Sequence, residues 1–126
     1  MYIIDSSVYC ALFLYEDTNH EKAKTLLHAM EEKIYVPYIV LTECLTVLTY
    51  KHSKERANEF AEFIFSDSRF VLIDADIPSE VAFWESIDKN ISYVDIILSY
   101  IAMRQWLELI SFDEAMMKLY SQLKNQ

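Results

Sequence analysis

The sequence predicts an α/β protein, a three-layer α/β/α sandwich around a mainly parallel sheet of four to five strands. Short apolar runs rich in β-branched and aromatic residues alternate with longer segments of helical periodicity, which is the order of βαβ units. Parallel sheets of this kind are covered by helices on both faces. The 126 residues with 53% hydrophobic content suit one domain, so we expect residues 1–126 to form a single domain.

The first strand and helix follow directly from the residue types. "YIID" is a short apolar run closed by polar residues, and Ser6 or Ser7 is expected to cap the helix "VYCALFLY". The other strands are expected at 34–37, 69–74 and 107–111. The other helices are expected at 20–33, 39–52, 53–67, 78–90, 92–102 and 113–126. Ser53 and Pro78 are residue types favoured at helix starts.

Composition excludes several classes of protein. Glycine is absent, so neither a P-loop nor a dinucleotide-binding fingerprint can be present. No run of ~18 uncharged apolar residues exists and the N-terminus lacks a basic region, so we expect no membrane span, no signal peptide and a cytoplasmic location. Cys10 and Cys44 form no paired motif and the histidines are scattered, which predicts reduced thiols and no zinc site.

The net charge of −9 argues against a broad nucleic-acid surface, because phosphate affinity comes mainly from lysine and arginine. A local basic patch is still compatible with it. The densest cluster is "YKHSKER", Tyr50 to Arg56, for which an ordinary solvated helix junction and a substrate contact both remain open.

Two aspartates are expected at one edge of the sheet. Asp5 ends the first strand and Asp113 follows the fourth, and ligands of such folds bind outside the carboxyl ends of the strands. Each aspartate alone could equally be a helix cap or a turn residue.

Two further acids lie on largely apolar helices. Asp95 forms a narrow polar stripe with Ser92 and Ser99, and this stripe faces either solvent or polar partners in the protein. Glu43 lies on the flank of a helix and could by itself be an ordinary exposed residue.

Together, the four carboxylates suggest one acidic pocket. Clustered carboxylates repel one another unless a hard cation neutralises them, and oxygen-only ligands suit Mg²⁺ or Mn²⁺. Such ions can activate water and stabilise a leaving oxygen in phosphodiester hydrolysis. Which acid would position the water is left open.

Four segments in order resemble the PIN-domain family, and within it the VapC-type toxin ribonucleases. They are "YIIDSSVYCALFL", "VPYIVLTECLTVL", "ISYVDIILSYIA" and "LELISFDEAMMKLY". The resemblance implies that Asp5, Glu43, Asp95 and Asp113 bind metal. It also implies that hydroxyls at Ser6 or Ser7 and at Ser111 support them, and Ser92 is a further candidate beside Asp95.

The resemblance implies Mg²⁺- or Mn²⁺-dependent cleavage of single-stranded or structured RNA. It further implies a homodimer neutralised by a cognate antitoxin protein. The chain departs from the family pattern because a fifth strand is missing or very short, and candidate RNA contacts outside the motifs are Arg69, Arg104 and the Lys51 to Arg56 cluster.

Two alternatives remain. The first is a catalytically inactive PIN-like module that binds RNA or protein. The second is a receiver-like signalling domain with Asp74 or Asp76 as its phosphoacceptor, although no suitable lysine follows "LELIS".

Overall fold

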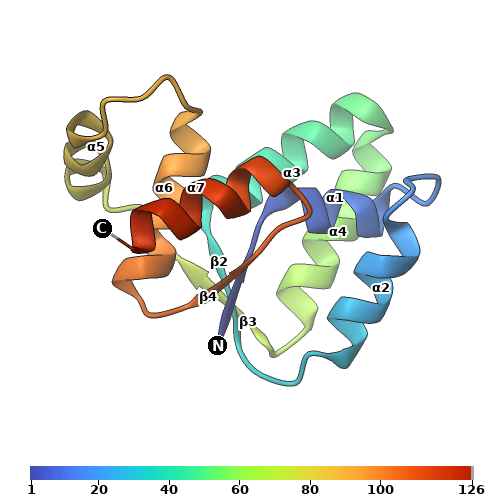
Figure 1. Ribbon diagram of the computed structural model, residues 1–126. Coiled ribbons are helices and arrows are strands. Elements are labelled where there is room, and N and C mark those ends of the chain that lie inside the picture. The colour runs from blue at the N-terminus through green and yellow to red at the C-terminus, as the bar shows by residue number, and fades with distance from the viewer. Residues whose placement is uncertain (126) are drawn as a thin grey trace.

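The computed structural model describes residues 1–125 and shows the predicted α/β/α sandwich (Figure 1). Its strands are β1 (Tyr2–Ile4), β2 (Ile34–Pro37), β3 (Phe70–Ile73) and β4 (Glu108–Ile110). They lie in the order β3-β2-β1-β4, and every neighbouring pair is parallel. The sheet has four strands among the described residues, the lower of the two expected numbers.

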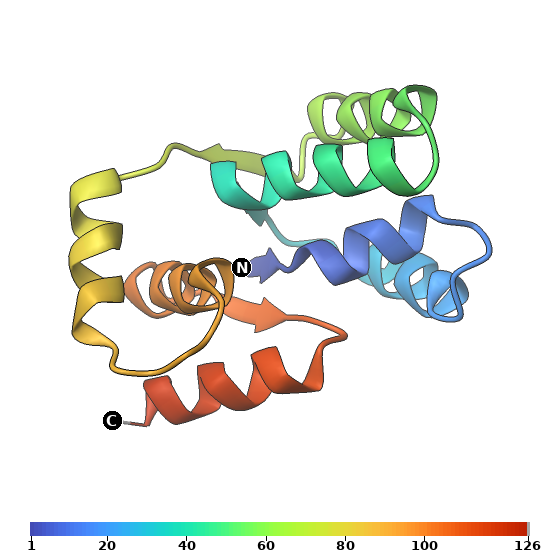
Figure 2. The same cartoon turned by 90° about the horizontal axis from the view of Figure 1, so that it is seen from above.

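The helices fall into two groups. The first contains α1 (Ser6–Phe13), α2 (His20–Ala29), α3 (Tyr38–Lys51) and α4 (Lys54–Ser66). The second contains α5 (Ile77–Ser86), α6 (Tyr93–Arg104) and α7 (Glu114–Lys124). Helices contact their own group most, and Figure 2 shows the two groups apart. The last helix was predicted to end at Gln126, which lies outside the described residues.

Within residues 1–125, no helix is long and apolar enough to cross a membrane.

The chain reverses its direction of growth across the sheet at β1. From β1 it adds β2 and then β3 on one side, and it then crosses to place β4 on the other side. In parallel α/β sheets the crevice at such a reversal, outside the carboxyl ends of the strands, is the usual ligand site. The expected ligand site therefore lies at the carboxyl ends of β1 and β4.

The core is built around β1, which is one of the two inner strands of the sheet. Ile3 and Ile4 are inaccessible to solvent because helices cover both faces of the strand. Beside them Tyr9 and Phe60 pack edge to face with ring centroids 5.5 Å apart, which joins α1 to α4. This packing fixes the start of α1 directly after β1.

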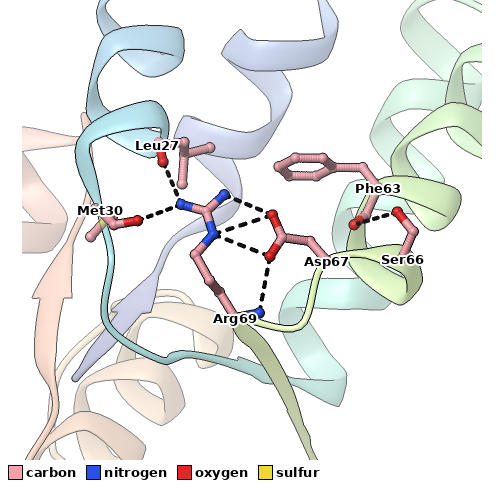
Figure 3. A network of polar contacts seen from close by, with 6 residues as sticks. All are labelled: Leu27, Met30, Phe63, Ser66, Asp67 and Arg69. Carbon is pink, nitrogen blue, oxygen red and sulfur yellow. Dashed lines mark hydrogen bonds and ion pairs between the residues drawn. The ribbon is translucent and has the colours of Figure 1, made fainter.

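A polar network lies at the opposite, amino edge of the sheet (Figure 3). The guanidinium of Arg69, just before β3, pairs with Asp67 at 2.8 Å. It also donates hydrogen bonds to the carbonyl oxygens of Leu27 and Met30 at the end of α2. Arg69 thus joins the end of α2 to the turn before β3, and a contact between Arg69 and RNA stays a prediction.

Candidate functional site

Asp5 is the buried acid at the carboxyl end of β1, with 6% of its surface exposed. Its Oδ2 atom accepts hydrogen bonds from Ser7 Oγ at 2.9 Å and from Ser111 Oγ at 2.8 Å. A carboxylate needs such donors to be tolerated in the interior. Because Ser7 lies on α1 and Ser111 follows β4, these bonds join the ends of the two strands at the reversal point.

The two serines after Asp5 do not cap α1, so that prediction was wrong. The helix begins at Ser6, and Asp5 occupies the cap position without a side-chain capping bond. Ser6 Oγ instead donates to Glu43 Oε1, and Ser7 Oγ donates to Asp5 and accepts from the backbone N–H of Phe112. Serine hydroxyls that meet carboxylates in three dimensions leave their local capping role.

Asp113 is a helix cap as well as a member of the acidic group. Its Oδ1 accepts from the N–H groups of Ala115 at 2.9 Å and Met116 at 3.2 Å, at the start of α7. Its own N–H donates to Ser111 Oγ at 3.0 Å. Ser111 therefore bridges Asp5 and Asp113.

Asp95 lies half-buried in the first turn of α6 and is affected by all three other acids. Burial, together with the negative charges of Asp5, Asp113 and Glu43, raises the pKa of Asp95 to about 6. Repulsion of this kind acts only between nearby charges. The structure thus places the four predicted acids around one region.

The polar stripe around Asp95 differs from the expectation. Ser99 is fully buried, and its hydroxyl donates to the backbone carbonyl of Asp95 at 3.0 Å, so it does not line a cleft. Ser92 is exposed at the N-cap position of α6 and makes no capping bond there. Asp95 is therefore the member of the predicted stripe that interacts with the other acids.

Some of the carboxylates are already engaged by hydrogen bonds within the protein. Glu43 is bonded to Ser6 and Asp113 caps α7. Within residues 1–125, no three acid, thiol or imidazole side chains are already arranged so that they could hold a metal ion. The donor set itself, oxygen atoms of four mutually repelling carboxylates, has the chemistry that Mg²⁺ or Mn²⁺ requires.

Two thiols lie behind the acids, and their proximity was not foreseen. Cys10 on α1 is half-buried and Cys44 on α3 is buried, and both are free, as predicted. A hydrogen bond with Cys44 lowers the pKa of the Cys10 thiol, and burial raises the pKa of the Cys44 thiol. Cys10 lies on the same helix as Ser7, and Cys44 lies beside Glu43 on α3.

The fold and this acidic edge define a parallel α/β/α domain with carboxylates at its topological switch point. The sequence pattern described as PIN domain matches residues 2–121, and the chain belongs to that family. Family membership excludes the receiver-like alternative. No curated protein matches the sequence.

Two solved structures share the fold. VapC20 of Mycobacterium tuberculosis, described as a sarcin–ricin loop cleaving toxin, is 19% identical with a TM-score of 0.83, over 94% of this chain and 95% of that one. A toxin–antitoxin complex from Klebsiella pneumoniae is 22% identical with a TM-score of 0.63, over 90% of this chain and 87% of that one.

Proposed function

We propose that the protein is an endoribonuclease that depends on Mg²⁺ or Mn²⁺ and cleaves single-stranded or structured RNA as the toxin of a toxin–antitoxin pair. The observation that carries the proposal is the repulsion that Asp95 receives from Asp5, Asp113 and Glu43 at the switch point. A fold does not retain such a group of charges for stability alone.

The four acids would hold the metal, and their supporting bonds explain how they stay in place. A bound Mg²⁺ or Mn²⁺ ion would supply activation of water and stabilisation of the leaving oxygen. Ser7 and Ser111 orient Asp5, Ser6 holds Glu43, and the first turn of α7 holds Asp113. Without a cation, burial and repulsion raise the pKa of Asp95 to about 6, and a bound cation would offset that repulsion and favour the ionised carboxylate.

The proposed partners follow from the same site and from the related folds. One structural neighbour is described as a toxin that cleaves the sarcin–ricin loop, and the other is a toxin–antitoxin complex. We expect a cognate antitoxin to place an arginine or lysine among the carboxylates, where charge-assisted hydrogen bonds are strong. The active protein is expected to be a cytoplasmic homodimer.

Cleavage of RNA tests the proposal. Single-stranded RNA and transfer RNA should be cut by the purified protein in Mn²⁺ or Mg²⁺ and left intact in EDTA. Asp5→Asn and Asp95→Asn should each lose about 100-fold or more of the rate. Asp74→Asn, an exposed acid after β3, is the matched control and should keep the parental rate. Intact RNA under all these conditions overturns the proposal.

A second candidate is a PIN-like module that binds RNA or protein without cleaving. The bonds that already engage Glu43 and Asp113 are the observation in its favour. Calorimetric titration with Mn²⁺ separates the two: the nuclease binds the ion, and the inactive module does not.

A further inference from the structure

We propose that Tyr50 and Lys51, at the end of α3, form a platform that binds the RNA strand next to the bond that is cut. This inference rests on the proposed ribonuclease function. It assigns the substrate contact to a stacked base on Tyr50 and a phosphate on Lys51.

Tyr50 lies on the same side of α3 as Glu43. The two residues are seven positions apart, which in an α-helix corresponds to an advance of ~10 Å and a rotation within ~20° of full turns. Both views show α3 running beside α1, away from the carboxyl edge of the sheet (Figures 1 and 2). A strand bound at the acids and laid along α3 reaches Tyr50.

The ring of Tyr50 is free to stack. It is 92% exposed, and no aromatic or cation–π partner is recorded for it among residues 1–125. Aromatic rings beside lysines are the usual elements of single-strand binding, because every base offers a face for stacking.

Lys51 is the neighbouring cation with no salt bridge in the described part of the chain. The positive charge of Lys51 lowers the pKa of the Cys10 thiol, whereas the negative charges of Asp5 and Glu43 raise it. Lys51 is therefore within electrostatic reach of the acidic region. By contrast Arg56 is already engaged: its guanidinium lies 4.0 Å from the Tyr15 ring, donates to Phe13 O and pairs with Glu59.

The basic surface around Lys51 is small. Lys51, His52 and Arg56 line a pocket of about 400 Å³, but Glu16 and Asp17 line it as well. Such a surface suits one or two phosphates of a single strand, whereas a duplex needs a longer row of cations.

Binding can be measured without cleavage. In an Asp95→Asn background, fluorescence anisotropy with a labelled single-stranded oligoribonucleotide should show that Tyr50→Ala weakens binding roughly 5- to 100-fold, the loss expected for one stacked base. Tyr50→Phe should keep the affinity because stacking needs the ring and not the hydroxyl. Lys51→Ala should flatten the dependence of affinity on salt.

Trp106→Ala is the matched control, since Trp106 is 91% exposed and precedes β4 at the amino edge of the sheet. It should leave RNA binding unchanged.

In the protein with all four acids, Tyr50→Ala should raise KM and keep kcat within about 3-fold of the parent. The lost contact binds the substrate and the transition state equally.

The inference is overturned if Tyr50→Ala binds RNA as tightly as the parent does, including the case in which this variant changes only the oligomeric mass. It is also overturned if Tyr50→Phe loses as much RNA affinity as Tyr50→Ala. Failure of the ribonuclease proposal has a different signature: no variant and no metal condition cuts RNA, whatever the anisotropy shows.

Discussion

Asp95 carries an unfavourable negative charge in the metal-free protein. Its pKa of about 6 lies above the usual 3.8, so folding favours the protonated carboxyl. The stabilising effect is complete below about pH 4 and is lost as the pH rises through about 6. At neutral pH the folded state therefore holds a charge that it disfavours.

Asp95→Asn should accordingly raise the melting temperature at pH 7.5 in EDTA and change it little at pH 4. Thermal unfolding followed by circular dichroism at both pH values measures this. Asp88→Asn, an exposed acid before α6, serves as the control. A lower melting temperature for Asp95→Asn at pH 7.5 would show that Asp95 stabilises the fold instead.

Asp113 has two roles that substitution can separate. Asn caps helices as well as Asp does, whereas Ala at a cap costs about 1 kcal/mol. Asp113→Asn should therefore keep parental stability and lose RNA cleavage, and Asp113→Ala should lose both. Chemical denaturation and the cleavage assay provide the two readouts, and full activity in Asp113→Asn would limit this residue to capping.

The sequence could suggest the candidate acids of the site, but it could not predict their hydrogen-bond partners. Asp5 and Asp113 follow strands, and Asp95 interrupts an apolar helix, so each acid left a local sign. Ser6 donates a hydrogen bond to Glu43, which lies 37 positions away, and Ser111 donates one to Asp5, which lies 106 positions away. Local preference predicted capping for the serines because it carries no information on such distant carboxylates.

At the scale of elements, the predicted strands and helices are present, and the differences lie at their ends. The helix expected to reach residue 33 ends at Ala29. The carbonyl oxygens of Leu27 and Met30 there accept hydrogen bonds from Arg69, which lies 42 and 39 positions further along the chain. A distant donor that satisfies the last carbonyls of a helix cannot be read from the helix's own sequence.

Arg69→Ala should lower the free energy of unfolding by about 2–3 kcal/mol, because charge-assisted bonds to two helix carbonyls and Asp67 are lost. Arg104→Ala is the comparison: the half-exposed guanidinium of Arg104 pairs with Asp76 at 3.7 Å and donates to the Ser79 and Tyr100 hydroxyls, and exposed ion pairs of this kind contribute about 1 kcal/mol or less. Urea unfolding gives both values. If the role of Arg69 is structural, the folded fraction of Arg69→Ala should cleave RNA at the parental rate, whereas a selective loss of cleavage would show that Arg69 also contacts RNA.

At the scale of the whole molecule, strand order creates the site. β1 and β4 are neighbours although most of the chain lies between them, and their carboxyl ends bring Asp5 and Asp113 together. Alternation of strands and helices predicted the parallel sheet and this edge. The positions of Glu43 and Asp95 depend on how α3 and α6 pack beside the edge, which periodicity does not determine.

We propose that the four carboxylates, which come from separate segments of the chain, act as one metal site. Calorimetric titration with Mn²⁺ tests it most directly, in the parent and in Asp5→Asn, Glu43→Gln, Asp95→Asn and Asp113→Asn. Mn²⁺ should bind saturably to the parent, at least about 10-fold more weakly to each of these four variants, and with parental affinity to Asp74→Asn. Absence of binding by the parent, or unchanged affinity in all four variants, would contradict it.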